Sequence, residues 1–140
     1  MAQDTKNFKV REFACKHCGK NEIDQRVLNM AQELRDYLGV PIRVSSGYRC
    51  ETHNTAVGGA KKKIDAKTGK VLNKGSNHMY GLAADLTCSL GAAKMFEAVK
   101  ELHDKQGKLK DLDYCIKYTK KNFIHIDCGG KRKSLYEVRS

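Results

Sequence analysis

The stretch at residues 112–129, LDYCIKYTKKNFIHIDCG, decides the fold because it holds two segments in which apolar and polar residues alternate. Alternation with a period of two is typical of β-strands that have one buried face. The charged pair Lys120-Lys121 lies between the segments, at the place where the chain must turn. The stretch therefore predicts an antiparallel pair of strands.

Two other segments have the spacing of amphipathic helices. In IDQRVLNMAQELRDYLG, at residues 23–39, apolar residues recur at helical intervals between Asp24, a suitable N-cap, and Gly39, a typical helix end. The segment SLGAAKMFEAVKELHDKQG predicts a second helix, with Ser89 as its N-cap and Gly107 as its end. We therefore expect two helices beside the predicted strands.

The remaining segments complete the predicted sheet. IRVSSGYR, at residues 42–49, predicts a short strand that runs into a turn, and GLAADLTC, at residues 81–88, predicts another strand. The intervening residues 54–77 are rich in Gly, Lys, Asn and Thr, which indicates a long exposed loop. The order of elements predicts an α+β fold, with a small, mostly antiparallel sheet and flanking helices, in a single domain over residues 1–140.

The composition limits the class of protein. A chain of 140 residues with 40% hydrophobic content can bury one modest core. No apolar run is long enough for a membrane-spanning helix, and the N-terminal sequence MAQDTKNFKVREF lacks the apolar region of a secretory signal. We therefore expect a soluble monomer that is cytoplasmic as synthesised, with no signal peptide and no transmembrane segment.

The formal net charge of +11 predicts attraction to a polyanion, which could be nucleic acid, an anionic lipid surface or an acidic wall polymer. The basic residues form only small clusters, without interleaved aromatic residues, and Trp is absent. These features are unlike a single-strand stacking surface or a common DNA-reading module. We therefore do not expect nucleic acid as the primary partner.

The six cysteines are expected to be free thiols, and two of them form a CxxC motif, Cys15-x-x-Cys18. A zinc ribbon needs a second pair at similar spacing, whereas the other cysteines are single, and the flanking sequence does not match a thioredoxin-like motif. A structural packing role is favoured for the motif. A second metal bound together with Cys50 or His17 is left open as the alternative.

One constellation of residues suggests metal chemistry. In the strand 81–88, Asp85 lies opposite the leucines that pack in the core, and in the last strand His125 and Asp127 share one face. If both strands belong to one sheet, these three side chains converge, and His78 can fold back over them from the preceding loop. A cation would then explain why a carboxylate is tolerated among small and apolar residues.

Two imidazoles and one carboxylate, from His78, Asp85 and His125, would suit one Zn²⁺ ion per chain and leave a tetrahedral position for water. The two-histidine, one-carboxylate site of non-haem iron oxygenases is a related alternative. Those enzymes usually take their last histidine from further downstream, and no histidine follows residue 125. The order of the ligands therefore argues against iron.

The pattern Ser76-x-His78-x-x-Gly81-x-Ala83-x-Asp85, followed by His125-x-Asp127, resembles the signature of the M15 zinc peptidases, which include D-alanyl-D-alanine carboxypeptidases and have a Hedgehog-like fold. The blocks SSGYRCETHNTAVGG, at residues 45–59, and EFACKHCG are also similar to segments of that family. The resemblance implies that the predicted histidines and Asp85 are the zinc ligands. It also implies that Arg49 grips a substrate carboxylate, which suits a planar guanidinium.

The chain departs from the family pattern at the general base. Some relatives carry a glutamate or a histidine shortly before the last ligand, where this chain has Asn122 and Phe123, neither of which can accept the proton. Asp127 is the remaining candidate, either as the base or as a partner that orients an imidazole. Ser76 and Tyr80 are candidate substrate-binding residues, although Ser76 could instead cap the loop before His78.

The resemblance implies a zinc peptidase that hydrolyses peptide bonds of bacterial peptidoglycan. It would act as a D-Ala-D-Ala carboxypeptidase or as an endopeptidase, for example a phage lysin that is released to the cell wall at lysis. Its charge would suit anionic wall polymers. The alternative is a non-catalytic zinc-containing module that binds the cell wall, because the usual base is missing. The third hypothesis is a basic protein that binds nucleic acid.

Overall fold

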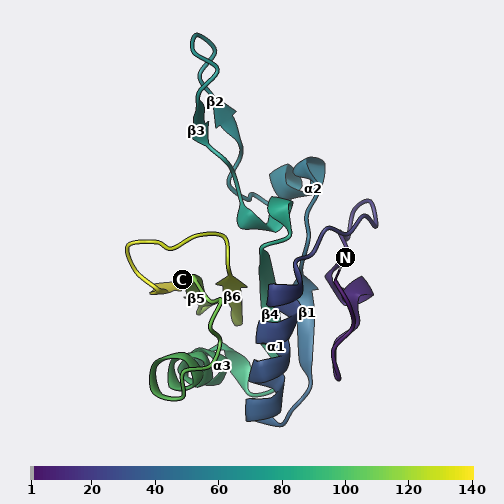
Figure 1. Ribbon diagram of the computed structural model, residues 1–140, viewed down its shortest axis with the longest axis vertical. Coiled ribbons are helices and arrows are strands. Elements are labelled where there is room, and N and C mark those ends of the chain that lie inside the picture. Colours follow the sequence, from purple (N-terminus) through teal and green to yellow (C-terminus); the bar gives the residue numbers. More distant parts are fainter. Residues whose placement is uncertain (1) are drawn as a thin grey trace.

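A five-stranded sheet forms the centre of the protein, as the computed structural model shows for residues 2–140 (Figure 1). Its order is β1-β4-β6-β5-β7, and every neighbouring pair is antiparallel except β5 and β7. The predicted α+β class with a mostly antiparallel sheet is confirmed. The strands are β1 (Ile42–Ser46), β4 (Ala83–Cys88), β6 (Phe123–Asp127), β5 (Tyr114–Tyr118) and β7 (Tyr136–Arg139).

Helices α1 (Gln25–Leu38) and α3 (Gly91–Lys100) supply the apolar cover for the sheet (Figure 1). The chain continues from α3 into a short π-helical turn, η3 (Glu101–Lys105). Alternate residues of β4 and β6 belong to the same core cluster as the inner residues of both helices, which include Ala84, Leu86, Ile124, Ile126, Val27, Leu34, Met95, Phe96 and Val99. The opposite faces of β4 and β6 are therefore available for a site.

The first predicted helix begins and ends where its sequence indicates. The Asp24 side chain accepts a hydrogen bond from the Arg26 backbone N–H at 2.9 Å, and Gly39 ends the helix in the left-handed conformation with φ 70°. The predicted N-cap of the second helix is wrong, because Leu90 and not Ser89 precedes its first residue. There the Asn122 side chain accepts the Ala92 N–H at 2.8 Å, so a distant turn replaces a local cap.

The predicted hairpin is confirmed, because β5 and β6 pair antiparallel around a turn that contains the two lysines. Strand β7, which pairs in parallel with β5, was not predicted. It has only four residues, YEVR, none of them fully buried, so its sequence has little of the alternation that marks a strand. Its place in the sheet depends on pairing with β5 and not on an apolar pattern of its own.

The prediction of a long exposed loop at residues 54–77 is wrong in part, because the region is not all loop. The region begins inside helix α2 (Glu51–Ala56) and contains strands β2 (Lys63–Ile64) and β3 (Val71–Asn73), which form a two-stranded arm that projects from the body (Figure 1). All residues of both strands are exposed, so the arm lacks the buried face whose alternation would have revealed it. The expected exposure of this region is confirmed.

The N-terminal segment packs closely under the turn that follows β1. A short 3₁₀ helix, η1 (Val10–Phe13), places Phe13 in the core, and the Tyr48 N–H donates to the Phe13 carbonyl at 2.7 Å. A Cβ atom on Gly47 would lie 2.4 Å from the Phe13 carbonyl oxygen, so only glycine fits there. Among residues 2–140, no helix has the length and apolar content needed to cross a bilayer.

Candidate metal centre

Antiparallel pairing of β4 and β6 brings the two central candidates face to face. Asp85 is the cross-strand partner of His125, and Ala83 is the partner of Asp127. Directly paired residues project from the same side of a sheet, which here is the side opposite the core. A small residue at Ala83 leaves space beside Asp127, as the sequence pattern suggested.

His78 reaches the same place from a short 3₁₀ helix, η2 (Asn77–Tyr80), immediately before β4. The Ser76 hydroxyl caps this turn by accepting the His78 N–H at 3.2 Å. His78 is 2% exposed, and its Nδ1 atom lies 2.8 Å from the Gly47 carbonyl oxygen. A carbonyl can only accept, so Nδ1 carries the proton and the Nε2 lone pair points toward Asp85.

One carboxylate oxygen lies between the two imidazoles. Asp85 Oδ1 is 3.3 Å from His78 Nε2 and 3.0 Å from His125 Nδ1. The ligand atoms of the three residues all lie within 4.8 Å of one another. Zinc bonds of about 2.0–2.2 Å to nitrogen and oxygen place tetrahedral ligands about 3.4 Å apart. These residues therefore fit a zinc ion in both donor chemistry and spacing.

The second carboxylate of the cluster, Asp127, contacts the ring nitrogen of His125 that faces away from Asp85. Asp127 Oδ2 lies 2.7 Å from His125 Nε2, and the Asp127 side chain is fully buried, with 0% exposure. The Gly129 backbone N–H also points to this carboxylate, at 3.4 Å. When the His125 ring is neutral, a proton held on Nε2 by Asp127 leaves the Nδ1 lone pair to face the candidate metal position.

The ionisation states of the cluster follow from burial and close charges. Burial alone would raise the pKa of the Asp85 carboxyl, but the two neighbouring imidazoles hold that pKa well below its usual range. Burial lowers the pKa of His78, which keeps its ring neutral. Burial also opposes the charge on His125, yet its hydrogen bonds to Asp127 and Asp85 raise the pKa of His125 to about 9.

Arg49 is held against the other oxygen of the central carboxylate. Its Nη2 atom lies 3.1 Å from Asp85 Oδ2, while its Nε donates to Ser46 Oγ at 2.9 Å. The Arg49 backbone N–H donates to the His78 carbonyl oxygen at 3.0 Å, which ties the turn after β1 to η2. The guanidinium thus orients Asp85 and also lines the open cleft.

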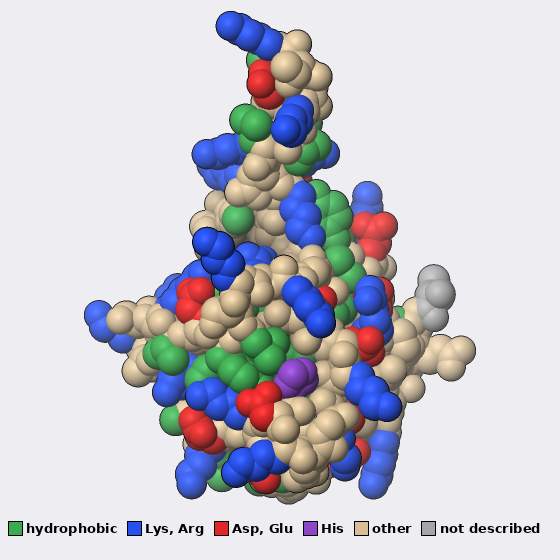
Figure 2. Space-filling model, turned by 60° about the vertical axis from the view of Figure 1, so that its left-hand side comes forward, with side chains coloured by type: hydrophobic (Ala, Val, Ile, Leu, Met, Phe, Trp, Pro, Cys, Tyr) green, Lys and Arg blue, Asp and Glu red, His purple; other side chains and the backbone are tan. Residues whose placement is uncertain are grey.

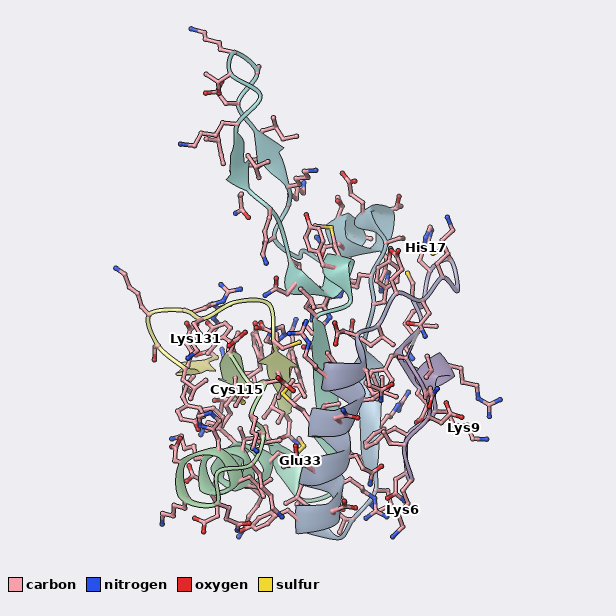
Figure 3. The ribbon with its side chains drawn as sticks, viewed as in Figure 1. Lys6, Lys9, His17, Glu33, Cys115 and Lys131 are labelled. Carbon is pink, nitrogen blue, oxygen red and sulfur yellow. The ribbon has the colours of Figure 1, made fainter. Side chains whose placement is uncertain are left out.

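The cluster lies in a cleft of about 660 Å³. Cationic side chains from distant parts of the chain line it: Arg49, Lys74, Lys121, Lys131, Arg132 and Arg139. Figure 3 shows Lys131 on the loop between β6 and β7, and Figure 2 shows further basic side chains along the projecting arm and over the body below it. An anionic substrate would be attracted to this cleft.

The remaining sequence candidates divide between the cleft and its surroundings. Ser76 lines the cleft, whereas Tyr80 is not among the lining residues and donates its hydroxyl to the Lys74 carbonyl oxygen at 2.6 Å, at the base of the arm. Phe123 lines the cleft and stacks on Tyr118, with ring centroids 4.5 Å apart. Asn122, used as the cap of α3, has no part in the cluster.

Sequence reasoning missed two buried amides. Asn54 in α2 accepts from Arg49 Nη1 at 3.4 Å and donates to the Ala60 carbonyl oxygen at 2.9 Å, so it braces the arginine. Asn77 lines the cleft beside His78, and its amide atoms have no hydrogen-bond partner of normal geometry within residues 2–140. Each is adjacent to a conspicuous motif residue, but burial of an amide leaves no signal in a single sequence.

Comparison with known proteins agrees with this geometry. The family model described as Peptidase M15 matches residues 6–127, which cover most of the chain and all three candidate metal ligands. No curated protein matches the sequence. The resemblance drawn from the spaced histidines and aspartate is thus confirmed, and membership indicates zinc peptidase activity. The chain belongs to the peptidase M15 family.

Proposed function

We propose that this metallopeptidase hydrolyses peptide bonds of bacterial peptidoglycan, with His78, Asp85 and His125 as the ligands of one Zn²⁺ ion. The observation that carries the proposal is the position of Asp85 Oδ1, 3.3 and 3.0 Å from nitrogen atoms of the two histidines, inside a cleft lined by basic residues. When bound, zinc would polarise the scissile carbonyl and acidify a water molecule toward a pKa of about 7. The protein residues then have to orient the ligands and the substrate.

Asp127 is proposed to position His125 and not to take the proton from water. Its Oδ2 is occupied by His125 Nε2 at 2.7 Å, and the residue has no exposed surface through which a water molecule could reach it. A carboxylate behind a ligating imidazole fixes the tautomer and increases the basicity of the ligand. This role explains why the aspartate follows the histidine at a spacing that keeps both on one face of β6.

The cationic lining supports a substrate that carries a free carboxylate. Arg49 has a fixed position, through Ser46 and Asp85, from which its fork can reach into the cleft. Lys131 and Arg132 lie on the loop after β6, and Lys74 lies at the base of the arm, so positive charge surrounds the cluster. Stem peptides of peptidoglycan present carboxylates both within and at the end of the chain. The buried amide of Asn77 could additionally bind a peptide group of the substrate.

The test is product analysis of purified peptidoglycan incubated with the zinc-loaded protein. Mass spectrometry would show released D-alanine for a carboxypeptidase, or new internal termini for an endopeptidase. His78→Ala is expected to abolish both products, whereas His103→Ala is the matched control, because His103 is a histidine outside the cleft. Absence of any new terminus with wild-type protein at full zinc occupancy would refute the peptidase proposal.

A specific observation supports a second candidate, the non-catalytic wall-binding module. The two carboxylates of the cluster, Asp85 and Asp127, are both engaged by imidazoles or Arg49, so neither is free to act as a base. Such a module would sediment with intact cell walls, would lose this binding when the basic lining is reversed in charge, and would leave the wall peptides uncut. The same incubation separates the two candidates.

A further inference from the structure

Three cysteines that the metal centre does not use meet on the other side of the turn after β1. The sulfur atoms of Cys15, Cys18 and Cys50 all lie within 4.8 Å of one another. All three are free thiols, and their environments differ: Cys15 is buried, Cys50 is intermediate and Cys18 is exposed. Two thiolates on a tetrahedral zinc ion, with bonds of about 2.3 Å, lie about 3.8 Å apart. The observed cluster needs little adjustment to reach that geometry.

An imidazole stands at the distance of a fourth ligand. His17 Nδ1 lies 3.5 Å from Cys50 Sγ. Zinc bonds of about 2.3 Å to sulfur and about 2.05 Å to nitrogen separate two tetrahedral ligands by about 3.6 Å. Figure 3 shows His17 on the N-terminal loop before α1. Its ring is exposed and stacks on His53, with centroids 6.4 Å apart, so it can turn toward the sulfurs without disturbing the core.

The backbone around the sulfurs is arranged for thiolates. The Cys50 N–H points to Cys15 Sγ at 3.4 Å, and the His53 N–H points to Cys50 Sγ at 3.4 Å. Gly19 follows the CxxC with φ 76° and donates its N–H to the Cys15 carbonyl oxygen at 2.9 Å, which closes the turn that brings Cys15 and Cys18 to one side. Donors directed at sulfur favour its charged form. Packing alone gives no reason for an exposed thiol, Cys18, to lie beside these two sulfur atoms.

We propose that Cys15, Cys18, Cys50 and His17 bind a second Zn²⁺ ion, separate from the candidate catalytic centre. Three sulfur ligands and one nitrogen ligand fill a tetrahedral zinc ion, which is the composition of a structural site with no place for substrate. The ion joins the N-terminal loop to the residue next to Arg49. It thereby fixes the turn whose Gly47 carbonyl oxygen orients His78. This second zinc site does not depend on the peptidase proposal, because none of its four ligands lines the cleft.

The experiment uses the full chain purified under reducing conditions. Bound zinc is measured by inductively coupled plasma mass spectrometry, and Co²⁺ is used as a spectroscopic substitute for zinc. Wild-type protein is expected to hold about two zinc ions and to show intense thiolate-to-cobalt charge-transfer absorption. Cys18→Ser and His17→Ala should each lose about one ion, and Cys18→Ser should weaken the absorption. The matched controls are Cys88→Ser, a partly exposed thiol elsewhere, and His53→Ala, the stacking neighbour; both should retain the wild-type values.

The outcomes distinguish this site from the peptidase centre. A His78→Ala variant should lose the other ion and keep the thiolate absorption, so failure of one site leaves the other measurable. Unchanged zinc content and absorption in Cys18→Ser would overturn the proposal, as would a disulfide between any two of the three cysteines under the reducing conditions. Undiminished zinc affinity in His17→Ala would overturn the assignment of the fourth ligand. Because Cys18 and His17 are exposed, both variants should fold.

Discussion

The proposed zinc ligation of His125 makes the ion compete with a proton for the ring, and this competition predicts how metal affinity depends on pH. In the metal-free protein the two carboxylates that contact the ring raise the pKa of His125 to about 9, even though burial opposes its charge. Zinc binds only neutral imidazole, so the proton must leave before the ion can bind. His78 needs no such step, because burial lowers its pKa, and Asp85 remains ionised because its pKa lies below the usual range.

The expected magnitude follows from this single proton. The His125 proton alone should make apparent zinc affinity rise about tenfold per pH unit from pH 7, about 100-fold in all, and this contribution should level off above the His125 pKa of about 9. The metal-free protein should show the opposite trend in stability. A pKa raised above its unfolded value of about 6.5 contributes stability that is complete below that pH and is lost as pH rises through about 9.

The assay is zinc competition with a chromophoric chelator between pH 6.5 and 9.5, corrected for the chelator's own protonation. Cys18→Ser serves as the background, so that thiolate ligands do not contribute their own pH dependence. Calorimetry in buffers of different ionisation enthalpy should show release of about one proton from His125 per zinc ion at pH 7.5, in addition to the proton lost by zinc-bound water. An affinity that is flat between pH 7 and 9, with no proton released, would refute the proposed pairing of His125 with both carboxylates.

Three substitutions test the supports of the centre. Asp127→Asn weakens a buried charged contact to a ligating imidazole, and should reduce zinc affinity by about 10- to 100-fold in chelator competition; unchanged affinity would contradict its positioning role. Gly81→Ala forces a Cβ to within 1.8 Å of the Glu22 carbonyl oxygen at φ 71°, and should lower the free energy of unfolding by about 2 kcal/mol or more in chemical denaturation. Gly69→Ala is its control, because it has the same φ of 71° but open space, and a similar loss in both variants would exclude the clash as the cause. Arg49→Lys should lower kcat/KM by about tenfold or more on a peptide with a free terminal carboxylate but much less on its amidated form, and equal losses on both would exclude carboxylate binding.

Much of the centre could be predicted because it lies on regular strands. Alternation in β4 and β6 determines which side chains face away from the core, and antiparallel pairing then places Asp85 opposite His125. The first helix was equally predictable, because its cap residues Asp24 and Gly39 act on backbone groups that are only a few residues away in the sequence. In both cases the signal that made the prediction possible, strand alternation or a helix cap, is local in the sequence.

The parts that escaped prediction depend on distant partners. Asn122 replaces Ser89 at the start of α3 because a turn between two other strands brings its amide there. The arm formed by β2 and β3 has no buried face, and β7 is defined by its pairing with β5, so neither has a periodic signature. For the thiol cluster, the sequence left Cys50 open as a partner of the CxxC motif. Cys50 is far from the motif in sequence and approaches it only because the N-terminal segment lies beneath the turn after β1.

That close contact between the N-terminal segment and Gly47 determines where the chain can be shortened. The carbonyl group of Gly47 selects the tautomer of His78, and the backbone of Phe13 supports Gly47 from below. A truncated chain that started just before α1 would keep all three proposed zinc ligands of the cleft but would lose the Phe13 backbone that supports Gly47, and with it the support for His78. A minimal active fragment must therefore retain the short helix η1, although η1 lies outside the cleft.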